Sequence, residues 1–89
     1  MTPTRLHRAP HVLWRRTLDT VLLLPPGIDE PFVLAGTGPA LWELLAEPRA
    51  LDDLVAVLAA AYEADPDVVA ADVAPTVDRL TELGAIERV

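Results

Sequence analysis

The spacing of hydrophobic residues changes near Gly36, and this change limits the folds that the chain can adopt. Before Gly36, short apolar runs separated by Asp, Pro or Gly are typical of strands, at residues 11–17, 20–24 and 32–35. After it, apolar residues recur three and four positions apart, as in amphipathic helices, over residues 39–46, 51–63 and 66–83. This order predicts an α+β fold, with a three-stranded antiparallel sheet followed by three helices.

The third strand, residues 32–35, is expected at an edge of the sheet. Pro31 opens it, and proline lacks a backbone donor, which confines it mostly to edge strands and strand starts. The second strand is apolar at every position from Val21 to Leu24, as in a central strand, and the turn at residues 17–19 is short enough for a hairpin. An open sheet edge can accept another peptide through main-chain hydrogen bonds.

The first helix has a clear start and an apolar stripe. Thr37 is its expected N-cap, because a hydroxyl oxygen can accept a hydrogen bond from a free N–H of the first turn. Leu41, Leu44 and Leu45 form the buried stripe, and Trp42 flanks them.

The third helix has an expected start, an expected end and an interruption between them. Asp65 is a good N-cap, and Gly84 suits the position just after the helix end. Pro75 removes one hydrogen bond and clashes with the carbonyl of Ala71, at a cost of about 3 kcal/mol in an isolated helix. The sequence therefore predicts a kink, or two short helices that meet near residues 73–74.

Length and composition suit a small folded domain. The apolar fraction of 52% excludes a disordered chain, and 89 residues are enough for one domain. The first ten residues contain prolines and arginines without periodicity. We therefore expect a flexible N-terminal arm over residues 1–10 and a single domain over residues 11–89.

Charge is distributed unevenly along the chain, whose net charge is −7. Four arginines are the only charged residues among the first sixteen, whereas residues 17–89 hold fourteen acids against three arginines. An acidic surface repels phosphate, so a winged-helix nucleic-acid-binding protein is the less favoured alternative. A structural dimer that pairs the same sheet edge with itself is a further alternative.

The sequence contains no site for chemistry. His7 and His11 have no metal-ligand partner at helical spacing, and the acids show no calcium-loop pattern. Without Cys there is no thiolate metal ligand or nucleophile, which fits a reducing cytoplasm. The longest apolar run, residues 54–62, is too short to span a membrane. We expect no catalysis, cofactor, metal, nucleic acid or membrane partner.

The alternative to an enzyme is a peptide-binding surface. The third strand offers free backbone groups, and Val69, Val73, Thr76 and Leu80 of the third helix could form an apolar wall beside it. The same valines and Leu80 could equally fill the core. The periodicity alone leaves both possibilities open.

A resemblance to a known family supports the peptide-binding hypothesis. The run Val33-Leu34-Ala35-Gly36-Thr37-Gly38-Pro39-Ala40-Leu41-Trp42-Glu43-Leu44-Leu45 is followed by Leu51-Asp52-Asp53-Leu54, Tyr62, Asp72-Val73, Leu80 and Gly84-Ala85-Ile86. Together these residues resemble the PqqD-like family, the precursor-peptide recognition elements of ribosomally made, modified peptides. The resemblance covers residues 10–89.

This resemblance implies a winged-helix-like domain that recognises a leader peptide and delivers it to a leader peptidase or other tailoring enzyme. The leader would add a strand beside the third strand and lie against the third helix. The implied contact residues are Phe32, Val33, Leu34 and Ala35 on the strand, and Val69, Asp72, Val73, Thr76, Arg79 and Leu80 on the helix. The chain looks most like the partner of a lasso-peptide leader peptidase, and the alternative is a PqqD-type peptide chaperone for a radical enzyme.

Overall fold

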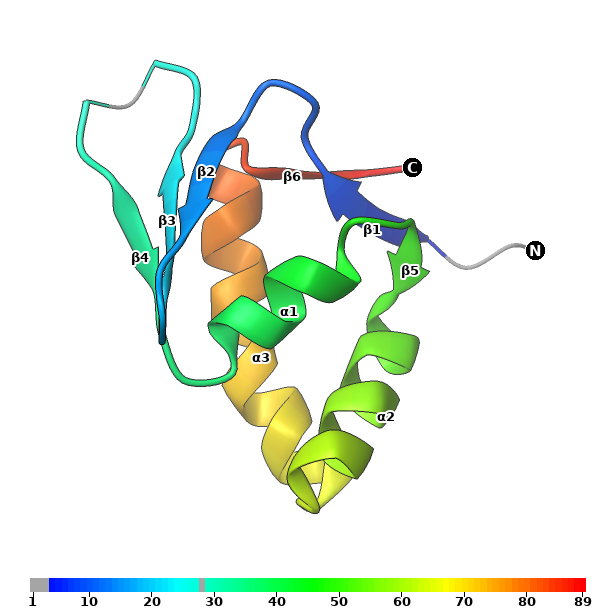
Figure 1. The fold of residues 1–89 in the computed structure, drawn as a ribbon. Helices are drawn as coiled ribbons and strands as arrows, with labels where there is room; N and C mark the ends of the chain where they lie inside the picture. The colour runs from blue at the N-terminus through cyan, green and yellow to red at the C-terminus, as the bar shows by residue number, and fades with distance from the viewer. Residues whose placement is uncertain (1–3, 28) are drawn as a thin grey trace.

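The computed structural model describes residues 4–27 and 29–89, which form two small sheets and three helices (Figure 1). In chain order the elements are β1 (Arg5–Arg8), β2 (Leu13–Arg16), β3 (Val21–Leu24), β4 (Phe32–Leu34), α1 (Gly38–Leu44), β5 (Arg49–Ala50), α2 (Leu51–Tyr62), α3 (Pro66–Glu82) and β6 (Ile86–Arg88). The predicted α+β class and the three predicted helices are confirmed.

The predicted sheet is present, with β3 between β2 and β4. All pairing is antiparallel, and Leu22 of β3 lies opposite Arg15 of β2 and Val33 of β4. β2 and β3 form the expected hairpin, whose ends are joined by a hydrogen bond from the Thr17 N–H to the Thr20 carbonyl at 2.9 Å. The central position of β3 and the edge position of β4 agree with the prediction.

A second sheet, with strand order β5-β1-β6, has no counterpart in the sequence prediction. Its central strand β1 lies within residues 1–10, where a flexible arm is expected; residues 1–3 of that arm lie outside the described residues. Leu6 of β1 pairs with Arg49 on one side and with Arg88 on the other, and its side chain is buried. Residues 5–8 are thus hydrogen-bonded on both edges rather than free.

Trp42 of α1 lies at the centre of the molecule rather than at the flank of its helix, where the sequence places it, because its side chain is fully buried. α1 can approach β4 closely since Gly38 has no side chain: a Cβ at that position would lie 2.9 Å from the Cβ of Leu34. Thr37 is the N-cap residue as expected, but its side chain makes no capping hydrogen bond.

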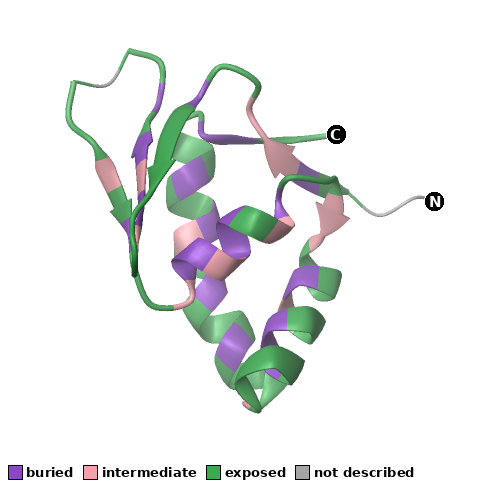
Figure 2. Ribbon diagram, in the orientation of Figure 1, coloured by how far each residue is buried: buried purple, intermediate pink, exposed green. Residues whose placement is uncertain are grey.

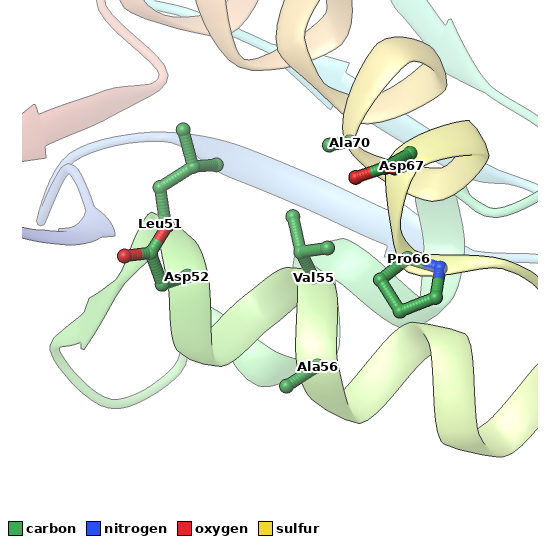
Figure 3. Close-up of a pocket in the computed structure, with 7 residues that line it drawn as sticks. All are labelled: Leu51, Asp52, Val55, Ala56, Pro66, Asp67 and Ala70. Atoms are coloured by element: carbon green, nitrogen blue, oxygen red, sulfur yellow. The ribbon is translucent and has the colours of Figure 1, made fainter.

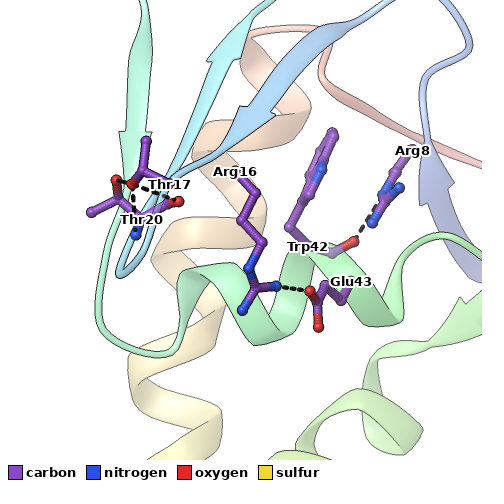
Figure 4. A network of polar contacts seen from close by, with 6 residues as sticks. All are labelled: Arg8, Arg16, Thr17, Thr20, Trp42 and Glu43. Atoms are coloured by element: carbon purple, nitrogen blue, oxygen red, sulfur yellow. Dashed lines mark hydrogen bonds and ion pairs between the residues drawn. The ribbon is translucent and has the colours of Figure 1, made fainter.

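Arg8 joins the second sheet to α1 (Figure 4). Its Nε donates a 2.8 Å hydrogen bond to the Trp42 carbonyl, and its guanidinium lies 4.7 Å from the ring centroid of Trp14 and 4.8 Å from that of Trp42. The two rings meet edge to face at 6.1 Å. Burial lowers the pKa of the Arg8 guanidinium from its ordinary value because the charged form loses water.

α3 is one continuous helix through Pro75. Of the two predicted alternatives, the division into two short helices is therefore wrong, and the kink stays a prediction. Asp65 caps it as expected, with its Oδ1 accepting a 2.8 Å hydrogen bond from the Asp67 N–H. At the other end Gly84 has a φ of +74°, a conformation in which glycine avoids the strain that a side chain would cause.

The core is shared by both sheets and all three helices, each of which contributes buried residues (Figure 2). Its fully or nearly fully buried members include Val21, Leu23, Leu34, Leu41, Trp42, Leu45, Leu54, Leu58, Val73, Leu80 and Ile86. In β3 and β4 the residues that alternate with the buried ones lie on the outer face of the sheet, where Leu24 and Val33 remain exposed. All four residues of β2 are exposed, among them Leu13.

Candidate functional site

The outer edge of β4 presents backbone groups that no strand among the described residues pairs with. Which residues carry them follows from the register. The Thr17–Thr20 pair is hydrogen-bonded, and bonded pairs alternate with non-bonded pairs along an antiparallel ladder. Leu22 therefore directs its N–H and C=O toward β2, whereas its neighbours Val21 and Leu23 direct theirs toward β4.

The same alternation assigns the backbone groups of β4. Phe32 and Leu34, which lie opposite Leu23 and Val21, use their backbone groups to bond β3. Val33 lies between them, so its N–H and C=O point away from the sheet. Val33 is thus the central donor and acceptor of the free edge.

The side chains of the predicted strand residues divide between the two faces of the sheet. Leu34 is buried in the core and Phe32 packs partly against it. Val33 is 53% exposed and Ala35 is exposed as well. A chain that paired with this edge would therefore meet Val33 and Ala35 on one face and Phe32 on the other.

Three of the six predicted contact residues of α3 lie in the core. Val69, Val73 and Leu80 are buried. The sequence allowed these side chains either to form an apolar wall beside the strand or to fill the core, and in the structure they fill the core. They hold α3 in place rather than forming an open wall.

The remaining three are Asp72, Thr76 and Arg79. Arg79 faces β4, and helical spacing places Asp72 and Thr76, seven and three residues before it, on the same side of α3. Asp72 and Arg79 are exposed and Thr76 is half-buried. The guanidinium carbon of Arg79 lies 6.0 Å from the ring centroid of Phe32, which brings the helix and the strand edge together. Arg79 also forms an exposed ion pair with Glu82 at 3.4 Å, so its charge is available at the surface.

The structure brings together a strand edge and a charged helix border. Within residues 4–27 and 29–89, no three His, Asp or Glu side chains are placed to hold a metal ion. In the same ranges none of the helices has the length and apolar character needed to cross a bilayer. The arrangement suits recognition of a peptide by main-chain pairing.

Of three comparisons with known proteins, only the one against protein-family models finds a match. A family model described as "Coenzyme PQQ synthesis protein D (PqqD)" matches residues 20–86. The matched region includes β3, β4 and all three helices, and therefore both sides of the candidate site. No curated protein and no solved structure matches the chain.

Proposed function

The chain belongs to the PqqD family, and on that basis we propose that it binds the leader segment of a ribosomally synthesised precursor peptide and presents it to a modifying enzyme. The family supports the coarser part of this statement, because its members are accessory proteins that bind precursor peptides and work with modifying enzymes. The mode of binding and the identity of the enzyme are our proposal.

The proposed mode of binding is strand addition at β4. The observation that carries it is the free edge, where Val33 directs an N–H and a C=O away from the sheet beside an adjacent helix border. Val33, Ala35 and Phe32 would contact the guest side chains. The buried Leu34, together with Val69, Val73 and Leu80, would support the edge from behind.

The charged residues of α3 would then set the preference for particular leaders. Asp72 and Arg79 stand on the border of the site with opposite charges, and Arg79 also covers part of Phe32. A charge on the guest placed opposite either residue would favour or disfavour binding, mainly through the association rate.

A single substitution tests the proposal at the backbone. Val33→Pro removes the outward N–H while the bonds of Phe32 and Leu34 to β3 remain. The affinity for a synthetic leader peptide that binds the unmodified protein should fall about tenfold or more, because main-chain bonds are lost and the edge is distorted. Isothermal titration calorimetry measures this loss.

Val33→Ala is the matched control, because it shortens the side chain and keeps the N–H, so it should weaken binding much less. If Val33→Pro does not fold by circular dichroism, amide hydrogen exchange of the unmodified protein decides instead. The Val33 amide should exchange more slowly once the leader peptide is added. Unchanged exchange with saturating peptide, or equal affinities for the two variants, contradicts strand addition.

We further propose a lasso-peptide precursor as the ligand and a leader peptidase as the enzyme served. The description of the matching family favours a second candidate, the precursor of pyrroloquinoline quinone and its radical enzyme. Titration of the two leader peptides against the chain separates these candidates. If the leader of the quinone precursor binds more tightly, that precursor becomes the favoured ligand and the lasso-peptide precursor becomes the second candidate.

A further inference from the structure

A second surface, separate from the β4 edge, lies between α2 and α3. A cavity of about 300 Å³ opens there, lined by Leu51, Asp52, Val55, Ala56, Pro66, Asp67 and Ala70; we name it the α2–α3 groove (Figure 3). Most of these side chains are aliphatic, and Leu51 remains 39% exposed. The floor of the groove is therefore apolar and open to solvent.

Two carboxylates border this apolar floor. In Figure 3, Asp52 of α2 and Asp67 of α3 stand on either side of Val55. Neither forms an ion pair within the described part of the chain. The capping oxygen of α3 belongs to Asp65 and not to Asp67, which leaves the Asp67 side chain available to a partner.

A second cavity adjoins the α2–α3 groove at Leu51. Leu51 also lines this neighbouring cavity of about 310 Å³, whose other lining residues are Thr4, Leu6, Val77, Asp78, Thr81 and Arg88. Asp78 and Arg88 give this second cavity charges of both signs, so the apolar floor bordered by carboxylates is confined to the α2–α3 groove.

The α2–α3 groove lies on the opposite side of α3 from the β4 edge. At about 100° per residue, Asp67 and Ala70 are separated from Asp72 and Arg79 by roughly half a helical turn. Because Arg79 contacts Phe32, the side of α3 that carries Asp72 and Arg79 faces β4. Because Asp67 and Ala70 line the groove, the side that carries them faces α2. Both surfaces can therefore be occupied at once.

We propose that the α2–α3 groove docks a basic, amphipathic segment of a partner protein, with aliphatic side chains on its floor and arginine or lysine opposite Asp52 and Asp67. Charge selects this occupant. The net charge of the chain is −7, and fourteen of its acids follow residue 16. Two copies that each carry a net charge of −7 repel one another at long range, which disfavours a second copy as the occupant.

Paired model peptides test the charge requirement. One helical peptide carries a leucine stripe flanked by arginine, and the other replaces every arginine with glutamate. The arginine peptide should shift the amide resonances of the groove residues saturably in a ¹⁵N–¹H NMR titration, and the glutamate peptide should not. Raised salt should weaken the binding.

Two variants locate the binding site. Asp52→Asn combined with Asp67→Asn should weaken the arginine peptide about three- to tenfold, as expected for two exposed ion pairs. Ala56→Arg should weaken it further by placing a like charge and bulk on the exposed floor. Asp19→Asn combined with Glu30→Gln removes the same charge away from the groove and should leave the affinity unchanged.

Several outcomes would overturn this inference. They are no saturable shift with the arginine peptide, equal binding of the two peptides, or equal losses in the groove and control variants. A leader peptide titrated in the presence of the arginine peptide should bind with unchanged affinity. Competition between the two would place the basic segment at the β4 edge instead.

Discussion

Arg8 shows how much one side chain can contribute to a domain of this size. Its guanidinium lies 4.7 Å from the ring centroid of Trp14 and 4.8 Å from that of Trp42, and its Nε donates a hydrogen bond to the Trp42 carbonyl. The planar guanidinium provides both interactions, whereas a lysine ammonium provides neither in the same geometry. A nominally conservative replacement therefore removes most of what this residue contributes.

We expect Arg8→Lys to lower the free energy of unfolding by about 1–3 kcal/mol through the lost hydrogen bond and ring contacts. For a chain of 89 residues each kcal/mol corresponds to about 4–8 °C in the melting temperature, which thermal denaturation followed by circular dichroism measures. Arg5→Lys on the same strand is the control, since Arg5 is exposed. Equal losses of stability in the two variants would show that the contacts of Arg8 with the tryptophan rings and the Trp42 carbonyl add no stability.

The role of Arg8 could not be predicted from the sequence. It lies 34 residues from Trp42, in a stretch without periodicity, and no local pattern indicates that the two meet. Trp42 was expected beside its helix stripe, and only the packing of Arg8, Trp14 and α1 places it at the centre. Periodicity assigns a residue to a face of its own element and does not identify the partner that covers it.

Among the elements, α3 is the one in which local preference and tertiary structure disagree. Pro75 lies within a continuous helix, exposed to solvent, and leaves the Ala71 carbonyl without its helical partner. Burial of Val73 and Leu80 on either side holds the helix together in spite of this loss. Tertiary packing outweighs the propensity that suggested two short helices.

Pro75→Ala should therefore stabilise the domain by about 1–2 kcal/mol. The helix regains a hydrogen bond, and the gain is partly offset because the unfolded chain becomes more flexible. Urea denaturation measures the difference. Pro66→Ala serves as the comparison, because Pro66 lies in the first turn, where proline is tolerated, and its replacement should not stabilise. A neutral or destabilising Pro75→Ala would mean that the proline fits this helix without cost.

Elements with strong local signals were predicted, and those that depend on distant partners were not. The hairpin, the edge strand β4 and the three helices each have turn residues, caps or periodicity of their own. β5 has two residues and β6 has three, and both exist as strands because β1 lies between them. At the candidate site, the strand positions followed from alternation, whereas the burial of Val69, Val73 and Leu80 required knowledge of what packs against α3.

At the scale of the whole molecule, β1 determines where the folding unit begins. It is the central strand of its sheet, Leu6 is part of the core and Arg8 binds α1. The sequence predicts a domain over residues 11–89. The pairing of β1 indicates that residues 5–8 contribute to its stability.

A chain restricted to residues 11–89 should be less stable than the full chain by about 3–5 kcal/mol, because it lacks a buried leucine and the Arg8 contacts. Domains of this size are stable by roughly 4–13 kcal/mol, so this loss is a large fraction of the total. Chemical denaturation of both forms measures it. Equal stability would support the shorter domain and leave β1 as an accessory strand.

The shortness of β4 limits how much of a guest sequence the domain could read. The strand has three residues; Pro31 before it has no N–H to offer, and the carbonyl of Ala35 after it accepts a bond from the Gly38 N–H. Only a few residues of a peptide bound here would pair with β4, so the rest of the peptide sequence could vary without loss of this pairing. One such domain could then bind many different precursor peptides that share a short recognition sequence.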